Sequence, residues 1–295
     1  MLRIRNFSAD TFQYVANLYA TEDWGYLSSD IKRYMEWEPD GCFVAKIDDK
    51  YVGHVFSVSY DHLGWIGLLR VDPNFRKRGI GSELMKQAIS YLHDTGVKVI
   101  KLEAVQNAVN LYRRLGFKEE FDSLRFRVVV QNLSVMEHTF SMNSSERVEI
   151  RPMKNKDILS IAELDSLYFG APRTKVLRTL FQEFPHLCFV ADTGNTLIGY
   201  VMCRKSTSGT YKIGPWVSDP EEPKVAGRLL ITCLRKLGEN NVLALGIPVI
   251  NEQAISILKK FGFQHASTCK RMYLGQIPVK DNPKGIFAIG GSEKG

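Results

Sequence analysis

The chain has 295 residues, more than one hydrophobic core usually organises, so two domains are expected. Hydrophobic residues make up 44% and charged residues 24% of the sequence, a globular balance that excludes disordered and fibrous proteins. The formal net charge of +7 favours an anionic or phosphorylated ligand, but it is not gathered into one Lys/Arg run and so does not identify that ligand.

Periodicity and turn residues predict a mixed α/β order in the first half of the chain. One sheet with helices on its faces is expected. The predicted strands are Leu2–Phe7, Cys42–Ile47, Val52–Tyr60, Trp65–Val71, Lys98–Ala104 and closing strands within Glu119–Gln131. The predicted helices are Asp10–Tyr19, Asp30–Trp37, Gly81–Asp94 and Asn107–Leu115.

The second half of the chain repeats the first at an offset of 146 or 147 positions. Six landmarks recur in one order, which indicates a tandem duplication with the polar stretch 141–146 as its linker. The pairs are Ile4-Arg5 with Ile150-Arg151, Cys42–Ala45 with Cys188–Ala191, Gly53 with Gly199, Asp72-Pro73 with Asp219-Pro220, Ala108 with Ala254, and Gly116-Phe117 with Gly262-Phe263. Two α/β (α+β mixed-sheet) domains are predicted, at 1–140 and 147–295. In the second, 270–273 and 285–289 are predicted to be closing strands.

No stretch reaches the roughly 18 to 20 apolar residues of a membrane span, and residues 1–20 lack the apolar core of a signal peptide. A cytoplasmic protein is therefore expected. The five cysteines are scattered, odd in number and never in a CxxC pair, which argues against a disulfide framework or a zinc site. They are expected to be reduced packing residues: Cys42, Cys188, Cys203, Cys233 and Cys269.

The most informative segment is 68–84, where a predicted strand enters a basic, glycine-bearing loop that opens a long helix. Free backbone N–H groups and the helix dipole favour an anion at such a helix start, and Gly79 and Gly81 let it approach without meeting a Cβ. Arg76, Lys77 and Arg78 add positive charge. The alternative is a surface turn whose glycines serve conformation and whose cations serve solubility.

The pattern Arg76-x-x-Gly79-x-Gly81, preceded by Val71-Asp72-Pro73, resembles the acetyl-CoA pyrophosphate loop of the GNAT acyltransferases. It has neither the GK[ST] of a Walker loop nor the order of a dinucleotide fingerprint. Residues 102–117 resemble the strand, helix and Gly-Phe that follow in this family. The resemblance covers nearly all of 1–131 and, more weakly, 147–275, similar to tandem GNAT proteins with a degenerate C-terminal copy.

The resemblance implies that acetyl-CoA is the co-substrate and that no metal is required. Backbone N–H groups from Lys77 to Ser82 would hold the pyrophosphate, and the pantetheine arm would pair with Leu69 and Val71. A backbone N–H near Leu69 would polarise the thioester carbonyl. Arg76 and Arg78 either contact phosphate or are solvated cations. The implied binding set is Leu69, Val71, Arg76, Lys77, Arg78, Gly79, Ile80, Gly81 and Ser82.

Tyr112 aligns with the family tyrosine that donates a proton to the departing CoA thiolate. A phenol is protonated at neutral pH and can still give its proton to a thiolate. The alternative is a core tyrosine. The equivalent residue in the second half is Leu258, so packing there needs no hydroxyl, which favours the catalytic interpretation.

The base that deprotonates the attacking amine is left open, because every candidate is also an ordinary surface polar residue. Aromatic residues nearby would either shape an acceptor pocket or belong to the core. The candidate bases are Asp61, His62, His54, Glu22 and Asp23, and the aromatic residues are Trp24, Tyr26 and Trp65.

The second half lacks the cofactor loop. Residues 221–228 have lost the paired glycines and carry Glu221 and Glu222 in place of cations, and these carboxylates would repel a pyrophosphate. The pattern from Pro248 through Asn251 to Gly262-Phe263 is kept, so the fold is expected to survive. This half is expected to act as a structural partner, an acceptor-binding wall or an oligomerisation surface.

Together these features predict an N-acetyltransferase that moves an acetyl group from acetyl-CoA to a primary amine by direct attack in a ternary complex. The acceptor is a small molecule or a peptide, and a homo-oligomer is compatible with the sequence. The competing interpretation is a non-catalytic acyl-CoA-binding regulator. Nucleic acid is not the expected partner, because no helix-turn-helix, zinc or RNP pattern accompanies the positive charge.

Overall fold

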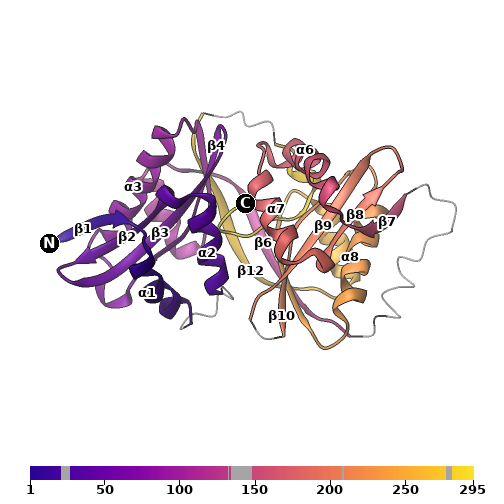
Figure 1. Cartoon of the computed structure of the whole chain (residues 1–295), viewed down its shortest axis with the longest axis horizontal. Helices are drawn as coiled ribbons and strands as arrows, with labels where there is room; N and C mark the ends of the chain where they lie inside the picture. Colours follow the sequence, from indigo (N-terminus) through magenta and orange to yellow (C-terminus); the bar gives the residue numbers. More distant parts are fainter. Residues whose placement is uncertain (21–26, 132, 134–147, 208, 277–280) are drawn as a thin grey trace. The chain divides into compact units, whose positions relative to one another are not determined.

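The computed structural model describes residues 1–20, 27–131, 133, 148–207, 209–276 and 281–295 (Figure 1). The chain forms two compact units, and neither is a single stretch of sequence. Unit 1 comprises Met1–Glu120, Lys270–Val279 and Ser292–Gly295, and unit 2 comprises Phe121–Cys269 and Lys280–Gly291.

Unit 1 is built on a sheet with the strand order β1-β2-β3-β4-β5-β12. Neighbouring strands are antiparallel except β4 and β5, which are parallel. The strands are β1 Leu2–Asn6, β2 Cys42–Ile47, β3 Lys50–Tyr60, β4 Leu63–Val71, β5 Val99–Ala104 and β12 Gln264–Gly275. The helices are α1 Ala9–Ala20, α2 Ser28–Trp37, α3 Ile80–Asp94 and α4 Val109–Arg114. The elements predicted for 1–117 are confirmed to within a few residues at their ends.

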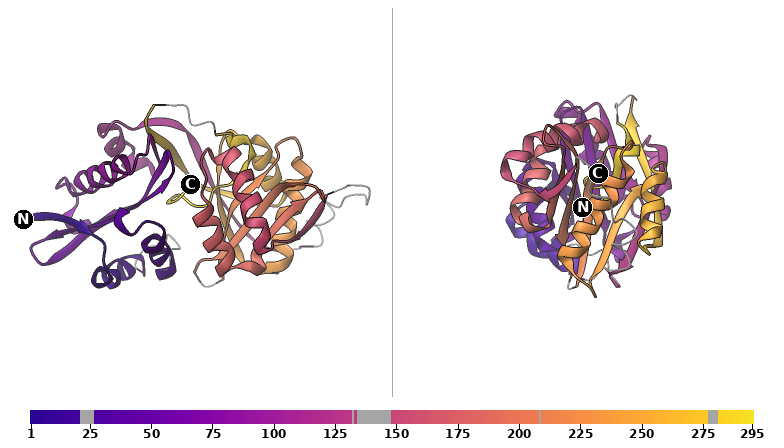
Figure 2. Two further views of the ribbon diagram at one scale, coloured as in Figure 1. Left: turned by 45° about the horizontal axis from the view of Figure 1, so that its top comes forward. Right: turned by 90° about the vertical axis from the view of Figure 1, so that its right-hand side faces the viewer.

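The long helix α3 buries Leu84, Met85, Ala88 and Leu92 against β2, β3 and β4. These positions recur every three to four residues, so one face of the helix meets the sheet. The helix α2 packs against β3, where Tyr34 lies against Phe56. Figure 2 shows these helices flanking the sheet of unit 1.

Unit 2 has the strand order β6-β11-β10-β9-β8-β7, and β13 pairs with β10. The strands are β6 Lys118–Val129, β7 Glu149–Pro152, β8 Cys188–Asp192, β9 Leu197–Lys205, β10 Thr210–Ser218, β11 Val242–Pro248 and β13 Ile286–Ala288. The helices are α6 Ile158–Phe169, α7 Thr174–Glu183, α8 Pro223–Leu237 and α9 Glu252–Lys260. The five cysteines are free and buried, as the sequence predicts.

Two strands complete sheets to which the sequence did not assign them. The stretch Lys270–Gly275 of β12 pairs with β5, and Ser123–Val129 of β6 pairs with β11. The strand predictions at 119–131 and 270–273 are therefore confirmed, but their expected placement in the sheets of the first and second halves is wrong. An alternating pattern defines a strand and its buried face, not the strand it pairs with. The boundaries 1–140 and 147–295 stay a prediction about the sequence duplication, and the compact units are composed differently.

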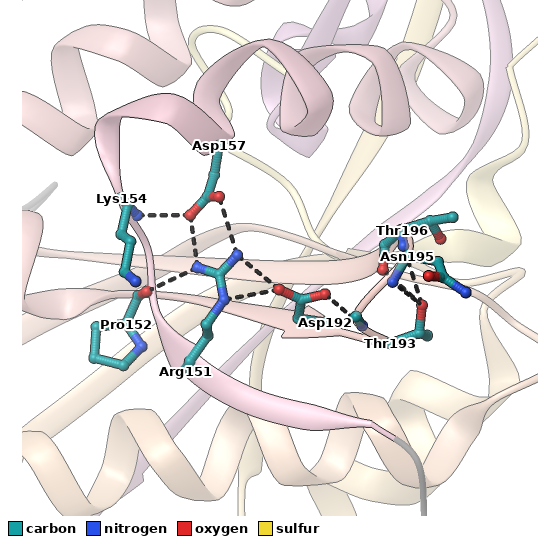
Figure 3. Close-up of polar contacts among 9 residues, drawn as sticks. Arg151, Pro152, Lys154, Asp157, Asp192, Thr193, Asn195 and Thr196 are labelled. Atoms are coloured by element: carbon teal, nitrogen blue, oxygen red, sulfur yellow. Dashed lines mark hydrogen bonds and ion pairs between the residues drawn. The ribbon is translucent and has the colours of Figure 1, made fainter.

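The strand β7 is tied to its neighbours in unit 2 by a partly buried ionic cluster (Figure 3). The guanidinium of Arg151 contacts Asp157 through two nitrogens, at 2.7 and 3.0 Å, and Asp192 through Nε at 2.9 Å. The backbone N–H of Lys154 also donates to Asp157, at 2.7 Å. Burial alone would raise the pKa of Asp157, but the hydrogen bonds from Arg151 and Lys154 bring it below its usual value.

Asp157→Asn should lower the free energy of unfolding by about 1 to 2 kcal/mol, because a charged hydrogen-bond partner of Arg151 is lost. A carboxyl whose pKa is lowered by folding contributes stability above its unfolded pKa of about 3.9 and loses it as the pH falls. In urea titrations, the difference in the free energy of unfolding between the variant and the wild type should therefore become smaller below about pH 4. Glu149→Gln, an exposed carboxylate of the same strand, is the control, and an equal loss in both variants would contradict the assignment.

Candidate active site

The loop after β4 is shaped by its own side chains. The Asp72 carboxylate accepts a hydrogen bond from the backbone N–H of Asn74 at 2.9 Å, which fixes the short turn Pro73–Phe75. The Arg76 Nε donates to the carbonyl oxygen of Val71 at 3.0 Å, across the base of the loop. This contact gives Arg76 a loop-holding role, whether or not it also reaches phosphate.

Two residues of the loop have left-handed backbone conformations, Lys77 with φ +63° and Gly79 with φ +79°. Only glycine adopts this region freely, so the strained position is Lys77. The Arg78 guanidinium lies 5.2 Å from the centre of the Phe75 ring. Lys77, Arg78 and Gly79 are all exposed, so the loop presents backbone and positive charge to solvent.

The helix α3 begins directly after Gly79, which provides no capping side chain. The first-turn N–H groups of a helix have no intrahelical acceptor, and they suit an anion. Ile80 is 2% exposed and packs in the core, so only its backbone is suited to a ligand. A Cβ on Gly81 would lie 3.6 Å from Leu111 and 3.7 Å from Val71, beside the end of β4.

The strands β4 and β5 are paired only over their first residues, from Leu63↔Val99 to Trp65↔Lys101. Leu68 then adopts a φ of +54°, and the pairing of β3 with β4 shifts register at the same level. Leu69 and Val71 therefore lie past the point where β4 is paired with β5. The sequence resemblance predicts that the pantetheine arm pairs with β4 at these residues.

Tyr112 lies on α4, the helix that follows β5, and is 8% exposed. Its ring packs edge-on against Phe117, with ring centroids 6.0 Å apart. Burial raises its pKa to about 12. The phenol therefore keeps its proton throughout the neutral pH range, as a proton donor must.

The candidate bases are not brought together. Asp61 and His62 form the exposed turn before β4, about 20 Å along the strand from Leu69, so neither reaches an amine near that residue. Glu22 and Asp23, with Trp24 and Tyr26, lie outside the described residues. His54 is fully buried, and desolvation together with the charge of Arg70 lowers its pKa to about 3. It is neutral at pH 7 and a weak base.

An ionic contact that sequence reasoning missed lies beside Trp65. Arg271 of β12 donates to the Glu103 carboxylate of β5 at 3.0 Å, and its guanidinium lies 4.6 Å from the centre of the Trp65 ring. Both charged side chains are buried, with 3% and 0% of their surface exposed. The two partners are 168 positions apart, and no local pattern in the sequence signals such a pair.

Unit 2 has lost the equivalent arrangement in two ways. The helix α8 begins with Pro223, which has no N–H, and Glu221 and Glu222 precede it. In addition, β13 pairs with Trp216 and Val217 of β10, and the N–H of Ile289 donates to Gly246 of β11 at 2.9 Å. Trp216 corresponds to Leu69 in the repeat. In unit 2 the chain itself therefore provides a strand at the position where β4 of unit 1 is not paired with β5.

Two family models match the chain, one in each half of the duplication. Residues 5–117 match the acetyltransferase (GNAT) family, and residues 161–288 match an acetyltransferase (GNAT) domain. The chain belongs to the GNAT acyltransferases. The matches agree with the tandem organisation predicted from the repeat, and the protein is accordingly an acyltransferase enzyme.

Relatives of this GNAT protein include one of similar length. Holothin acyltransferase of Pseudoalteromonas sp. (strain SANK 73390) is 26% identical over 98% of this chain and 92% of its own length. N-alpha-acetyltransferase MAK3 of Arabidopsis thaliana is 41% identical over 27% of this chain and 45% of its own length.

Solved structures show the same fold along the chain. One from Pyrococcus horikoshii covers 100% of this chain and 96% of its own with a TM-score of 0.79 at 22% identity. A tandem GNAT protein from the clavulanic acid biosynthesis pathway covers 94% of this chain and 99% of its own with a TM-score of 0.65 at 14% identity. At these identities the likeness concerns the fold alone.

Among the helices of the described residues, none is both long enough and apolar enough to cross a membrane. In the same residues, no three His, Cys, Asp or Glu side chains are grouped as metal ligands.

Gly81→Glu should abolish acetyl-CoA binding, because it adds bulk and negative charge beside the end of β4 and the start of α3. Isothermal calorimetry should give one site per chain for the wild type and none for this variant. Gln87→Glu adds the same charge to an exposed position of α3 and should bind as the wild type does. Two equivalent sites, or unchanged affinity in Gly81→Glu, would contradict the assignment of the loop.

The burial of His54 leads to a second prediction about unit 1, which concerns the pH dependence of its stability. The unfolded state takes up a proton near pH 6.5, whereas folded His54 does not until about pH 3. Because of this one histidine, the free energy of unfolding should therefore fall by about 1.4 kcal/mol for each pH unit below 6.5. His54→Gln should remove this contribution to the pH dependence of the free energy of unfolding, measured by urea titrations from pH 7 to 5. His62→Gln, which removes an exposed histidine, is the control, and parallel slopes in wild type and His54→Gln would refute the burial argument.

Proposed function

We propose that unit 1 transfers an acetyl group from acetyl-CoA to a primary amine, by direct attack of the amine on the thioester in a ternary complex. The observation that carries this proposal is the combination of an uncapped, basic helix start at Gly79 with the neighbouring strand β4, whose pairing with β5 ends at Trp65. A phosphate group and an extended arm are the two parts of coenzyme A that such features suit. We expect one acetyl-CoA per chain.

In this mechanism the backbone N–H groups from Lys77 to Ser82 bind the pyrophosphate, with Lys77 and Arg78 adding charge. Leu69 and Val71 align the pantetheine arm, and a backbone N–H near Leu69 stabilises the oxyanion that forms when the amine attacks the carbonyl carbon. Collapse of that intermediate breaks the carbon–sulfur bond. Tyr112 then gives its proton to the leaving thiolate, and the amine loses its own proton to solvent or to a base.

The relatives support an amine acceptor but do not decide between a small molecule and a peptide. One is named for holothin and others are N-alpha-acetyltransferases, so both a small molecule and a peptide are compatible with the family. The second candidate function is a non-catalytic acyl-CoA-binding regulator. It is favoured by the remote position of Asp61 and His62 and by the low basicity of His54.

Tyr112→Phe separates the enzyme from the regulator. The ring and its contact with Phe117 are kept, so stability and acetyl-CoA affinity should barely change. Turnover, measured as thiol release with a panel of amines, should fall by about 10² to 10⁴-fold, the usual contribution of general acid catalysis. Phe117→Leu, which alters the same packing but keeps the hydroxyl, is the control. Full turnover in Tyr112→Phe across the pH range would return this residue to a packing role.

A further inference from the structure

The strand β4 presents different residues to the two faces of the sheet in unit 1. A Cβ on Gly64 would meet Leu92 and Val97 on the α3 side. Since side chains alternate along a strand, Trp65 and Gly67 belong to the opposite face. On that face, a Cβ on Gly67 would lie 2.4 Å from the Glu293 Cα and 2.6 Å from the Glu293 carbonyl oxygen. Residues 292–295, here called the 292–295 segment, therefore pass directly against β4 near the label C in Figure 1.

Three aromatic side chains hold this segment by its backbone. The Trp65 Nε1 donates to the Ser292 carbonyl at 3.0 Å, the Tyr34 hydroxyl to that of Glu293, and the Tyr60 hydroxyl to that of Lys294 at 2.9 Å. We call Tyr34, Tyr60 and Trp65 the aromatic cradle. They come from α2, β3 and β4, so the tertiary structure gathers them.

The cradle binds three consecutive carbonyls of a short turn in the segment. Its three members are at most 1% exposed, and a buried donor that loses its acceptor costs about 1 to 3 kcal/mol. A molecule that replaces the segment and again shields these three donors from water therefore has to supply oxygen acceptors for them. Specificity for side chains is not needed for these contacts.

The segment also lies where the acceptor is required. Gly67 comes one residue before the left-handed Leu68 and two before Leu69, beside which the proposed function puts the thioester. The close contact with Glu293 depends on the missing Cβ of Gly67. An acceptor amine that reaches the thioester from this face of the sheet would have to pass the same place.

The segment itself brings a primary amine. The Lys294 ammonium forms an ion pair with the Glu293 carboxylate, and both side chains are 2% exposed. An amine held as the cation of an ion pair has no lone pair for attack. The desolvation cost of burying such a pair offsets much of its Coulombic attraction. The pair therefore contributes little to the binding of the segment in the cradle.

A glycine pair precedes the segment. Ile289 is anchored by its backbone hydrogen bond to Gly246 at 2.9 Å, and Gly291 has a φ of +152°, which other residues rarely adopt. The backbone freedom of Gly290 and Gly291 allows residues 292–295 to leave the cradle while β13 stays paired.

We propose that the 292–295 segment occupies the acceptor subsite of unit 1 as an internal stand-in for the acceptor, and that the acceptor is a peptide that presents a primary amine. This inference rests on the proposed function for the identity of the subsite. The aromatic cradle would bind the backbone of the incoming peptide, and the segment would compete with it.

The binding part is tested by NMR, without any turnover. Deleting residues 292–295 should shift the Trp65 indole N–H resonance, assigned through Trp65→Phe. The synthetic peptide Gly-Gly-Ser-Glu-Lys-Gly, added to the deletion variant, should return that resonance saturably towards its wild-type position. The same peptide should leave the full chain unchanged, because its own segment fills the cradle.

Gly67→Ala tests the subsite from the other side, since its Cβ cannot coexist with Glu293. In the full chain it should move the Trp65 resonance to the position seen in the deletion variant, and in the deletion variant it should prevent peptide binding. Gly64→Ala is the matched control, because its Cβ meets the flexible ends of Leu92 and Val97 on the opposite face of β4. Wild-type behaviour of Gly67→Ala, or no saturable shift with the peptide, would overturn the proposal.

Kinetics with a lysine-containing peptide separate this inference from the proposed function. If the segment fills the subsite nine-tenths of the time, its deletion should lower the acceptor KM about tenfold and leave the acetyl-CoA KM unchanged. Added hexapeptide should inhibit competitively against the acceptor alone. A higher acceptor KM after deletion would make the segment a wall of the pocket and overturn the proposal. Absence of thiol release in every variant would instead refute the proposed transferase activity, while the NMR result still decides the cradle.

Discussion

A sheet whose neighbouring strands diverge leaves backbone N–H and C=O groups that something else must satisfy. In unit 1, β4 and β5 are paired only as far as Trp65↔Lys101, whereas β4 continues to Val71. The equivalent position of unit 2 is occupied by β13, which pairs with Trp216 and Val217. The protein itself thus meets this requirement in unit 2, and we propose that acetyl-CoA does so in unit 1.

The features around this divergence act together. The loop from Asp72 to Gly79 places the start of α3 at the end of β4, and the Arg76 contact with Val71 holds the loop to the strand. In the proposed function, a pyrophosphate at the helix start and an extended arm along β4 would share one continuous site. In unit 2, the first helical residue is Pro223 and two carboxylates precede it, so this unit keeps neither of the two features.

The two faces of β4 have separate tasks. The α3 face supports the core through Leu84, Ala88 and Leu92, whereas the opposite face carries the aromatic cradle. Hydroxyl and indole groups suit this second face, because each combines a large apolar body with one hydrogen-bond donor. Buried donors of this kind discriminate strongly against molecules without matching acceptors. This is the physical argument for the peptide acceptor that we propose for unit 1.

Local pattern was enough to determine much of this protein. Alternation and helical periodicity located the strands and helices of 1–117, and the landmarks at one offset revealed the duplication. The order of Arg76, Gly79 and Gly81 after a strand indicated the family and predicted an anion site. These features are local because each depends on neighbours within one or two turns of chain. The roles of Tyr112 and the loop residues stay predictions.

Only the tertiary structure decided which strands pair and what lies on the face of β4 opposite α3. A period of two is equally compatible with any partner, so the pairings of Lys270–Gly275 with β5 and of Ser123–Val129 with β11 were beyond the sequence. The low pKa of His54 follows from complete burial beside Arg70, which an isolated histidine in a strand does not reveal. The 292–295 segment has no hydrophobic period at all; its place against Gly67 depends on donors from Tyr34, Tyr60 and Trp65, more than 220 positions away along the chain.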